Sequence, residues 1–90
     1  MPLQILSSPS PEPEQLAVTL REKIESAVPD ALVQVRAESP GHFSISVVSP
    51  SFEGRSRVKQ QQQVYAAIAE LMSGDAAPVH AIDRLVTRTS

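Results

Sequence analysis

ALVQVRAESPGHFSISVVS, residues 31–49, decides the fold. Apolar and polar residues alternate on each side of a central Pro-Gly pair, which is typical of a turn. A period of two places successive side chains on opposite faces of a strand. Val33 and Val35 therefore share one face before the turn, and Phe43 and Ile45 share one face after it. This stretch predicts an antiparallel hairpin with one buried face.

The chain before the hairpin predicts a helix. Its apolar residues recur at a four-residue spacing: Leu16, Leu20, Ile24 and Val28. This spacing forms one apolar stripe on a helix. We expect the helix to begin near Pro13, since Ser10 and Pro11 supply a cap candidate and a first-turn proline, and to end at Pro29-Asp30. Residues 1–12 contain several prolines and are predicted to be a flexible leader.

VKQQQQVYAAIAELM, residues 58–72, is either a polar low-complexity tract or a helix with one exposed face. Its apolar residues fall largely on one helical face: Val58, Val64, Tyr65, Ile68, Leu71 and Met72. Glutamine is a fair helix former. We therefore predict a helix over Ser56–Met72 with some of its four glutamines exposed, ended by Gly74. In the connector before it, Phe52 is the expected core anchor and Gly54 the expected positive-φ turn.

VHAIDRLV, residues 79–86, predicts a last strand. Its alternation is broken at Asp83 and Arg84, so the pattern does not assign its faces. The predicted order is helix, strand, strand, helix, strand over residues 13–87, followed by a tail at 88–90. This is an α+β domain with a small sheet and covering helices.

Composition excludes several classes of function. The chain has 90 residues, a net charge of −2 and no cysteine. One domain fits this length, and disulfide scaffolds, zinc ribbons and catalytic thiols are excluded. No apolar run approaches the roughly 20 residues that span a bilayer, and no secretory signal is recognisable. We expect a soluble cytoplasmic protein. No nucleophile elbow, phosphate loop or HExxH motif occurs, so we expect no enzyme.

Two kinds of side chain remain as candidate binding residues. His42 and His80 are the only ligands for soft metals, but a lone histidine is more often a surface or hydrogen-bonded residue. Arg55, Arg57 and Lys59 lie close together at the start of the second helix, where they suit phosphates or an acidic protein. A solvated polar helix end explains these three equally well.

HFSISVVSPSFEGRSRVKQQQQVYAAIAEL, residues 42–71, followed by VHAI, resembles the BolA family. The resemblance rests on H-F before an alternating strand, then V-V-S, F-x-G, a basic helix start, V-Y on the helix and H-A after a short loop. The lysine and glutamines match one branch of the family. The resemblance implies an α-β-β-α-β domain with a three-stranded sheet and helices on one face, similar to class II KH folds.

The resemblance also implies a partner and a cofactor. BolA proteins pair with monothiol glutaredoxins and share a [2Fe-2S] cluster, to which the glutaredoxin cysteine and glutathione supply sulfur. His80 matches the histidine that the family supplies, and His42 lies where some members supply a second ligand. Arg55, Arg57 and Lys59 are then candidate docking residues. The isolated chain would bind no cluster and would be a monomer or weak homodimer.

The alternative is a BolA-type transcriptional regulator that binds DNA through Arg55, Arg57 and Lys59. The two hypotheses differ in salt response, because DNA contact through basic residues weakens steeply with salt. They also differ in cofactor, since an adaptor gives visible cluster absorbance only together with glutaredoxin and glutathione.

Overall fold

The computed structural model describes residues 12–90. It contains two long helices, a one-turn 3-10 helix and three strands: α1 (Pro13–Ala27), β1 (Leu32–Ser39), β2 (His42–Val48), η2 (Pro50–Phe52), α2 (Arg57–Met72) and β3 (Ala81–Arg88). The predicted order is confirmed. The predicted flexible leader lies, except for Glu12, outside the described residues. Within residues 12–90, no helix has the length and apolarity needed to cross a membrane.

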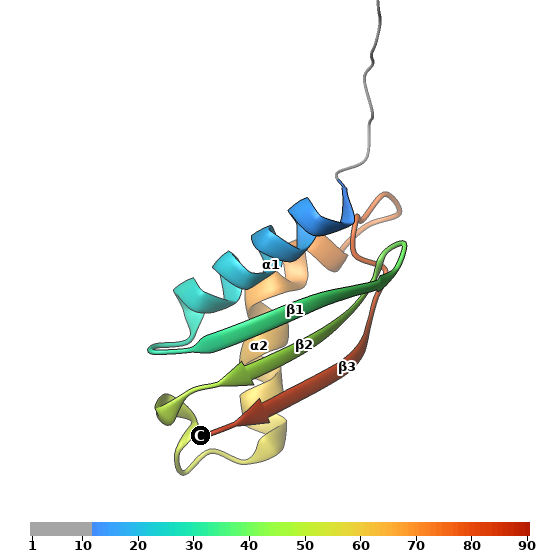
Figure 1. Ribbon diagram of the computed structural model, residues 1–90. Helices are drawn as coiled ribbons and strands as arrows, with labels where there is room; N and C mark the ends of the chain where they lie inside the picture. The colour runs from blue at the N-terminus through green and yellow to red at the C-terminus, as the bar shows by residue number, and fades with distance from the viewer. Residues whose placement is uncertain (1–11) are drawn as a thin grey trace, which may run out of the picture.

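The three strands form one mixed sheet in the order β1-β2-β3. β1 and β2 are antiparallel, as the Pro-Gly turn predicted, and β2 and β3 are parallel. A parallel return needs a crossover connection, which α2 provides. Both helices lie on the same side of the sheet (Figure 1). The α+β class with helices on one face is therefore confirmed.

The core fills the space between the helices and the sheet. The α1 residues Leu16, Leu20 and Ile24 are buried, so the four-residue stripe is the packed face of this helix. Phe43 and Phe52 are both fully buried. Phe43 enters the core from β2, and Phe52 enters it from η2 in the connector before α2. Burying a side chain of this size stabilises the fold by about 1.5–3 kcal/mol.

The buried face of α2 differs from the predicted one. Gln60, Val64 and Ile68 are buried, whereas Val58 is 63% exposed and Tyr65 is 39% exposed. The prediction placed six apolar residues largely on one face, and this was wrong for Val58 and Tyr65. A polar residue occupies the first position of the buried stripe, so an apolar count could not find it.

Hydrogen bonds explain how glutamine is accommodated in that stripe. Gln60 accepts a bond from the Thr87 hydroxyl at 2.8 Å. Gln61 donates to a β3 carbonyl at 3.3 Å, and Gln63 donates to a carbonyl at the end of α1 at 3.2 Å. Of the four, Gln60 is buried, Gln61 and Gln63 are half-buried, and Gln62 is exposed. The glutamine run therefore connects α2 to β3 and α1, and part of it is exposed as predicted.

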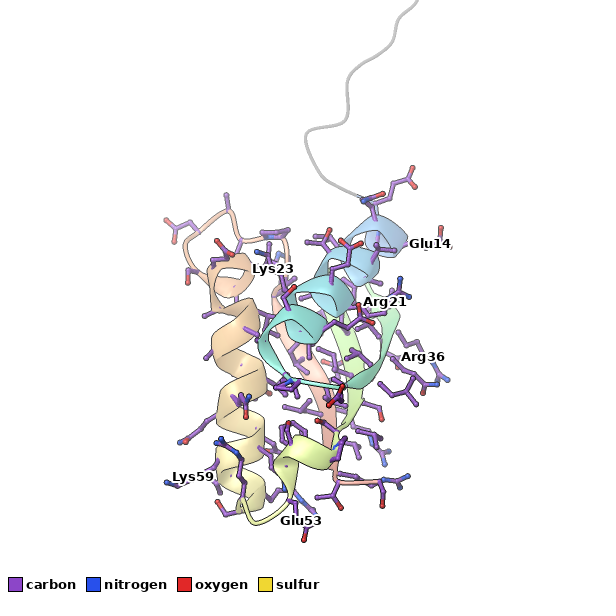
Figure 2. All side chains as sticks on the ribbon, turned by 90° about the vertical axis from the view of Figure 1, so that its left-hand side faces the viewer. Glu14, Arg21, Lys23, Arg36, Glu53 and Lys59 are labelled. Carbon is purple, nitrogen blue, oxygen red and sulfur yellow. The ribbon has the colours of Figure 1, made fainter. Side chains whose placement is uncertain are left out.

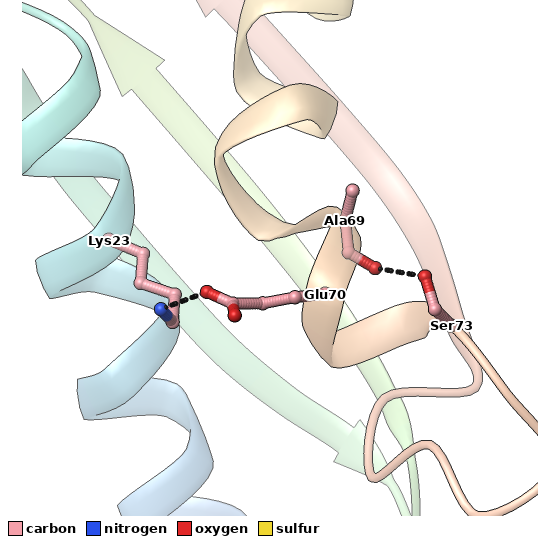
Figure 3. Close-up of polar contacts among 4 residues, drawn as sticks. All are labelled: Lys23, Ala69, Glu70 and Ser73. Atoms are coloured by element: carbon pink, nitrogen blue, oxygen red, sulfur yellow. Dashed lines mark hydrogen bonds and ion pairs between the residues drawn. The ribbon is translucent and has the colours of Figure 1, made fainter.

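The two long helices are joined by an ion pair. Lys23 of α1 donates a hydrogen bond to the carboxylate of Glu70 on α2 (Figure 3). The hydrogen bond and the positive charge of Lys23 lower the pKa of Glu70 below its usual value of 4.5. Directly after the end of α2, Ser73 donates to the carbonyl of Ala69 at 2.8 Å. Glu70 is exposed and Lys23 is only half-buried, so the Lys23–Glu70 pair is screened by salt.

A bulge in β3 explains its broken alternation. Ile82 pairs with Phe43 of β2, but Ser44, the next residue of β2, pairs with Arg84. Asp83 is therefore an extra residue between two paired ones. Such a bulge locally disrupts the ladder and redirects a side chain. After it, Leu85 and Thr87 return to the core side.

Candidate histidine site

The two histidines of the chain lie beside each other at one end of the sheet. His42 is the first residue of β2 and precedes the buried Phe43, so it lies on the face away from the core. His80 immediately precedes β3, which begins at Ala81, two residues later than the strand predicted over residues 79–86. Their ring centroids are 6.5 Å apart and their planes are nearly perpendicular, at 86°. The pairing of β2 with β3 therefore brings together residues that are far apart in sequence.

Gly41 forms the seat of the His80 ring. Its carbonyl accepts hydrogen bonds from the backbone N–H groups of His80 at 2.7 Å and Ala81 at 3.1 Å. A Cβ atom on Gly41 would lie 2.5 Å from Nδ1 and 2.7 Å from Cγ of His80. Gly41 also has a φ of 78°, which side chains other than glycine rarely adopt. Both the turn and the ring position therefore require glycine here.

Asp83 orients the other histidine. Its Oδ1 lies 2.9 Å from Nδ1 of His42. An ionised carboxylate can only accept, so His42 donates from Nδ1–H. This bond leaves Nε2 of His42 as the nitrogen available to a ligand. Sequence reasoning missed Asp83 as a site residue, and the break in alternation at this position was its only signal.

The site offers imidazole nitrogen and no thiolate. His42 is half-buried and His80 is exposed, so solvent reaches both rings. Within residues 12–90, no group of three or more His, Cys, Asp or Glu side chains could hold a metal ion. Imidazole nitrogen is a ligand for transition metals such as zinc, copper and iron.

The three basic candidates lie at the opposite end of the sheet. Arg55, Arg57 and Lys59 are exposed around the start of α2, and Lys59 projects outward there in Figure 2. Arg55 and Arg57 share a shallow hollow of about 420 Å³ with Arg88 at the end of β3. β2 runs from His42 toward this end, and a strand of its length spans roughly 20 Å. The histidines and the basic residues are therefore separate surfaces.

Comparisons with known proteins point to one family. A family model described as BolA-like protein matches residues 12–90. The chain is 38% identical to human BolA-like protein 1, and the match covers 70% of this chain and 50% of that protein. The chain spans about half the length of the curated relatives it matches first.

Solved structures give the same relationship. The solution structure of mouse BolA1 has a TM-score of 0.64 at 28% identity, over 99% of this chain and 76% of the mouse chain. A BolA homologue from Coxiella burnetii has a TM-score of 0.61 at 28% identity, over 78% of this chain and 85% of that chain. The fold and the sequence therefore agree on the relationship.

Proposed function

Because the chain belongs to the BolA-like family, we propose that it is a non-enzymatic adaptor that pairs with a monothiol glutaredoxin and glutathione. In that complex it contributes histidine nitrogen to a shared [2Fe-2S] cluster, in cluster trafficking or in iron and redox regulation. The observation that carries this proposal is the meeting of His42 and His80, with ring centroids 6.5 Å apart, at one end of the sheet.

The chemistry of the ligands supports a shared site. The chain has no cysteine, so the sulfur ligands come from the glutaredoxin cysteine and from glutathione. Histidine in place of cysteine raises the reduction potential of a [2Fe-2S] centre. Only the neutral imidazole binds metal, which makes histidine ligation sensitive to proton concentration.

The two histidines have different roles in this proposal. His80 is the main ligand, since its ring is exposed and its backbone is held by two hydrogen bonds to Gly41. His42 offers Nε2 as a second nitrogen, since its Nδ1 is bonded to Asp83. Arg55, Arg57 and Lys59 lie at the far end of the sheet, so they would dock a partner only through a second, separate contact.

Anaerobic cluster reconstitution tests the proposal. The chain is mixed with a monothiol glutaredoxin and glutathione, and visible absorbance and circular dichroism are recorded. We expect a spectrum distinct from that of the glutaredoxin homodimer, which is lost in His80→Ala and kept in Arg21→Ala, a change at an exposed residue of α1. Identical spectra for the wild-type chain and His80→Ala would refute His80 as the ligand, and a failure of the chain to form any complex would refute the adaptor.

DNA binding is the second candidate function. It is favoured by three guanidinium groups, those of Arg55, Arg57 and Arg88, around one hollow. Each phosphate contact contributes a slope of about −0.9 to the dependence of log affinity on log salt. We expect a slope near −3 for duplex DNA if all three groups contact phosphate, reduced by about one in Arg57→Ala. DNA binding that is unaffected by salt would refute this candidate.

A further inference from the structure

The bulge at Asp83 places the carboxylate of this residue next to His42. A regular strand would place that carboxylate opposite Ser44. His42 pairs with Ala81 and Phe43 pairs with Ile82, so an unbroken ladder would set Asp83 opposite Ser44. Residues two apart on one strand face are separated by roughly 6.6 Å, and the carboxylate would then lie beside Ser44. Because Arg84 takes the place opposite Ser44, Asp83 reaches His42 at 2.9 Å.

We propose that Asp83 is a positioning residue, which fixes the Nδ1–H tautomer and the ring orientation of His42 so that Nε2 faces a ligand. This inference rests on the adaptor function for its biological meaning, but the tautomer itself is a property of the isolated chain. Histidines that bind metals commonly donate their other N–H to a carboxylate, which orients the ring and raises the basicity of the free nitrogen.

The two histidine rings are oriented by different residues. The backbone of His80 is held by Gly41, and its ring lies against the glycine Cα. His42 has its Nδ1 held by a side chain from the neighbouring strand. The two rings are thus oriented by independent contacts, one from the β1–β2 turn and one from the bulge. A change at Asp83 therefore alters His42 while the contacts of Gly41 with His80 remain.

Long-range proton–nitrogen NMR of the isolated, nitrogen-15-labelled chain tests the inference. The chain has only two histidines, so each ring can be assigned by substitution. At about pH 8.5, where imidazole is neutral, we expect the Nδ1–H tautomer for His42 in the wild-type chain. In Asp83→Ala it should change to the Nε2–H tautomer, which imidazole prefers in water. In Asp83→Asn the Nδ1–H tautomer should be kept, because the amide oxygen still accepts.

Arg84→Ala is the matched control, since it changes the next exposed residue of β3 and keeps the carboxylate. Its His42 tautomer should equal that of the wild-type chain. An unchanged tautomer in Asp83→Ala, or the same change in Arg84→Ala, overturns the inference. Backbone amide spectra of each variant establish that it is folded.

A second measurement separates this inference from the adaptor function. In the reconstituted complex with glutaredoxin and glutathione, Asp83→Ala should lose cluster absorbance to a chelator about tenfold or more faster than the wild-type chain, as expected when an outer carboxylate is removed. Equal rates would refute the positioning of a ligand by Asp83. If no complex forms but the His42 tautomer changes in Asp83→Ala as expected, the adaptor function is refuted and the positioning of His42 by Asp83 is supported.

Discussion

Substitution of Gly41 by alanine tests whether the β1–β2 turn sets the position of His80. Gly41 has a φ of 78°, and a left-handed conformation costs a residue with a side chain roughly 1–2 kcal/mol. The new methyl group would also lie 2.5 Å from His80 Nδ1. Carbon atoms pack at about 3.5–4.0 Å, so the ring has to move away by about 1 Å or more.

The backbone cannot easily provide that movement, because two N–H groups donate to the Gly41 carbonyl. The exposed His80 ring can rotate into solvent instead. We therefore expect Gly41→Ala to lose about 1–2 kcal/mol of stability from its backbone alone. Each kcal/mol lowers Tm by roughly 4–8 °C in a domain of this size. The His80 ring signals should shift in a proton–carbon NMR spectrum, which contains only two histidines.

Gly54→Ala is the matched control. Gly54 has a φ of 82°, and nothing lies within 4 Å of a Cβ placed on it. It should lose a similar amount of stability and leave the His80 ring signals in place. If the ring signals of His80 shift equally in both variants, or in neither, the seat formed by Gly41 does not position this ring.

Three further predictions concern residues away from the histidines. Thr87→Val removes the hydroxyl that donates to the buried Gln60, and we expect the free energy of unfolding in urea to fall by about 1–3 kcal/mol. The fall should be smaller when Gln60→Leu is already present. An unchanged free energy of unfolding would contradict the hydrogen bond. Phe52→Ala deletes a fully buried ring and should cost about 3–5 kcal/mol by the same assay; a loss typical of a surface residue would show that Phe52 is not an anchor. Glu70→Gln removes the negative charge that Lys23 stabilises. The pKa of Glu70 is lowered from 4.5 in the folded chain. The stabilisation by the ion pair is therefore complete above pH 4.5 and is lost as the pH falls through the lower folded-state pKa. The difference in Tm between the wild-type chain and Glu70→Gln should therefore be full near about pH 7 and shrink in acid and in high salt, and a difference independent of pH would refute the ion pair.

Local patterns predicted much of the fold. The alternation around the Pro-Gly turn gave both strands of the hairpin, and the four-residue spacing gave α1. Phe52 is buried as expected, and Gly54 has the expected positive φ. These features depend on residues that are close in sequence, so a local sequence pattern is enough to predict them.

The buried face of α2 depended on contacts that no local pattern contains. Gln60 is buried because Thr87, 27 positions away, donates to it. Val58 and Tyr65 look apolar in sequence but lie off the stripe that the sheet covers. A scale of hydrophobicity cannot identify a buried amide that accepts from a distant strand and donates to carbonyls of the preceding connector.

The candidate site was predicted only in part. His42 and His80 were identified as residues, but their proximity follows from the parallel pairing of β2 with β3. Asp83 was noticed only as a fault in the alternation. A bulge shifts the register by one residue. The residues that face the core therefore alternate in one phase before the bulge and in the opposite phase after it, and a single period of two cannot describe both.

The parallel pairing of β2 with β3 also determines when the site forms during folding. His42 and Asp83 are 41 positions apart, and closing a loop of that length has an entropic cost that the hairpin avoids. The hairpin can form early, whereas the histidines meet only after α2 has crossed the sheet and β3 has docked. A chain whose last strand has detached loses the Gly41–His80 contact and the Asp83–His42 contact together. Ligand binding at the two rings would therefore stabilise the last strand above all, and hydrogen exchange in β3 would slow most when a ligand is bound.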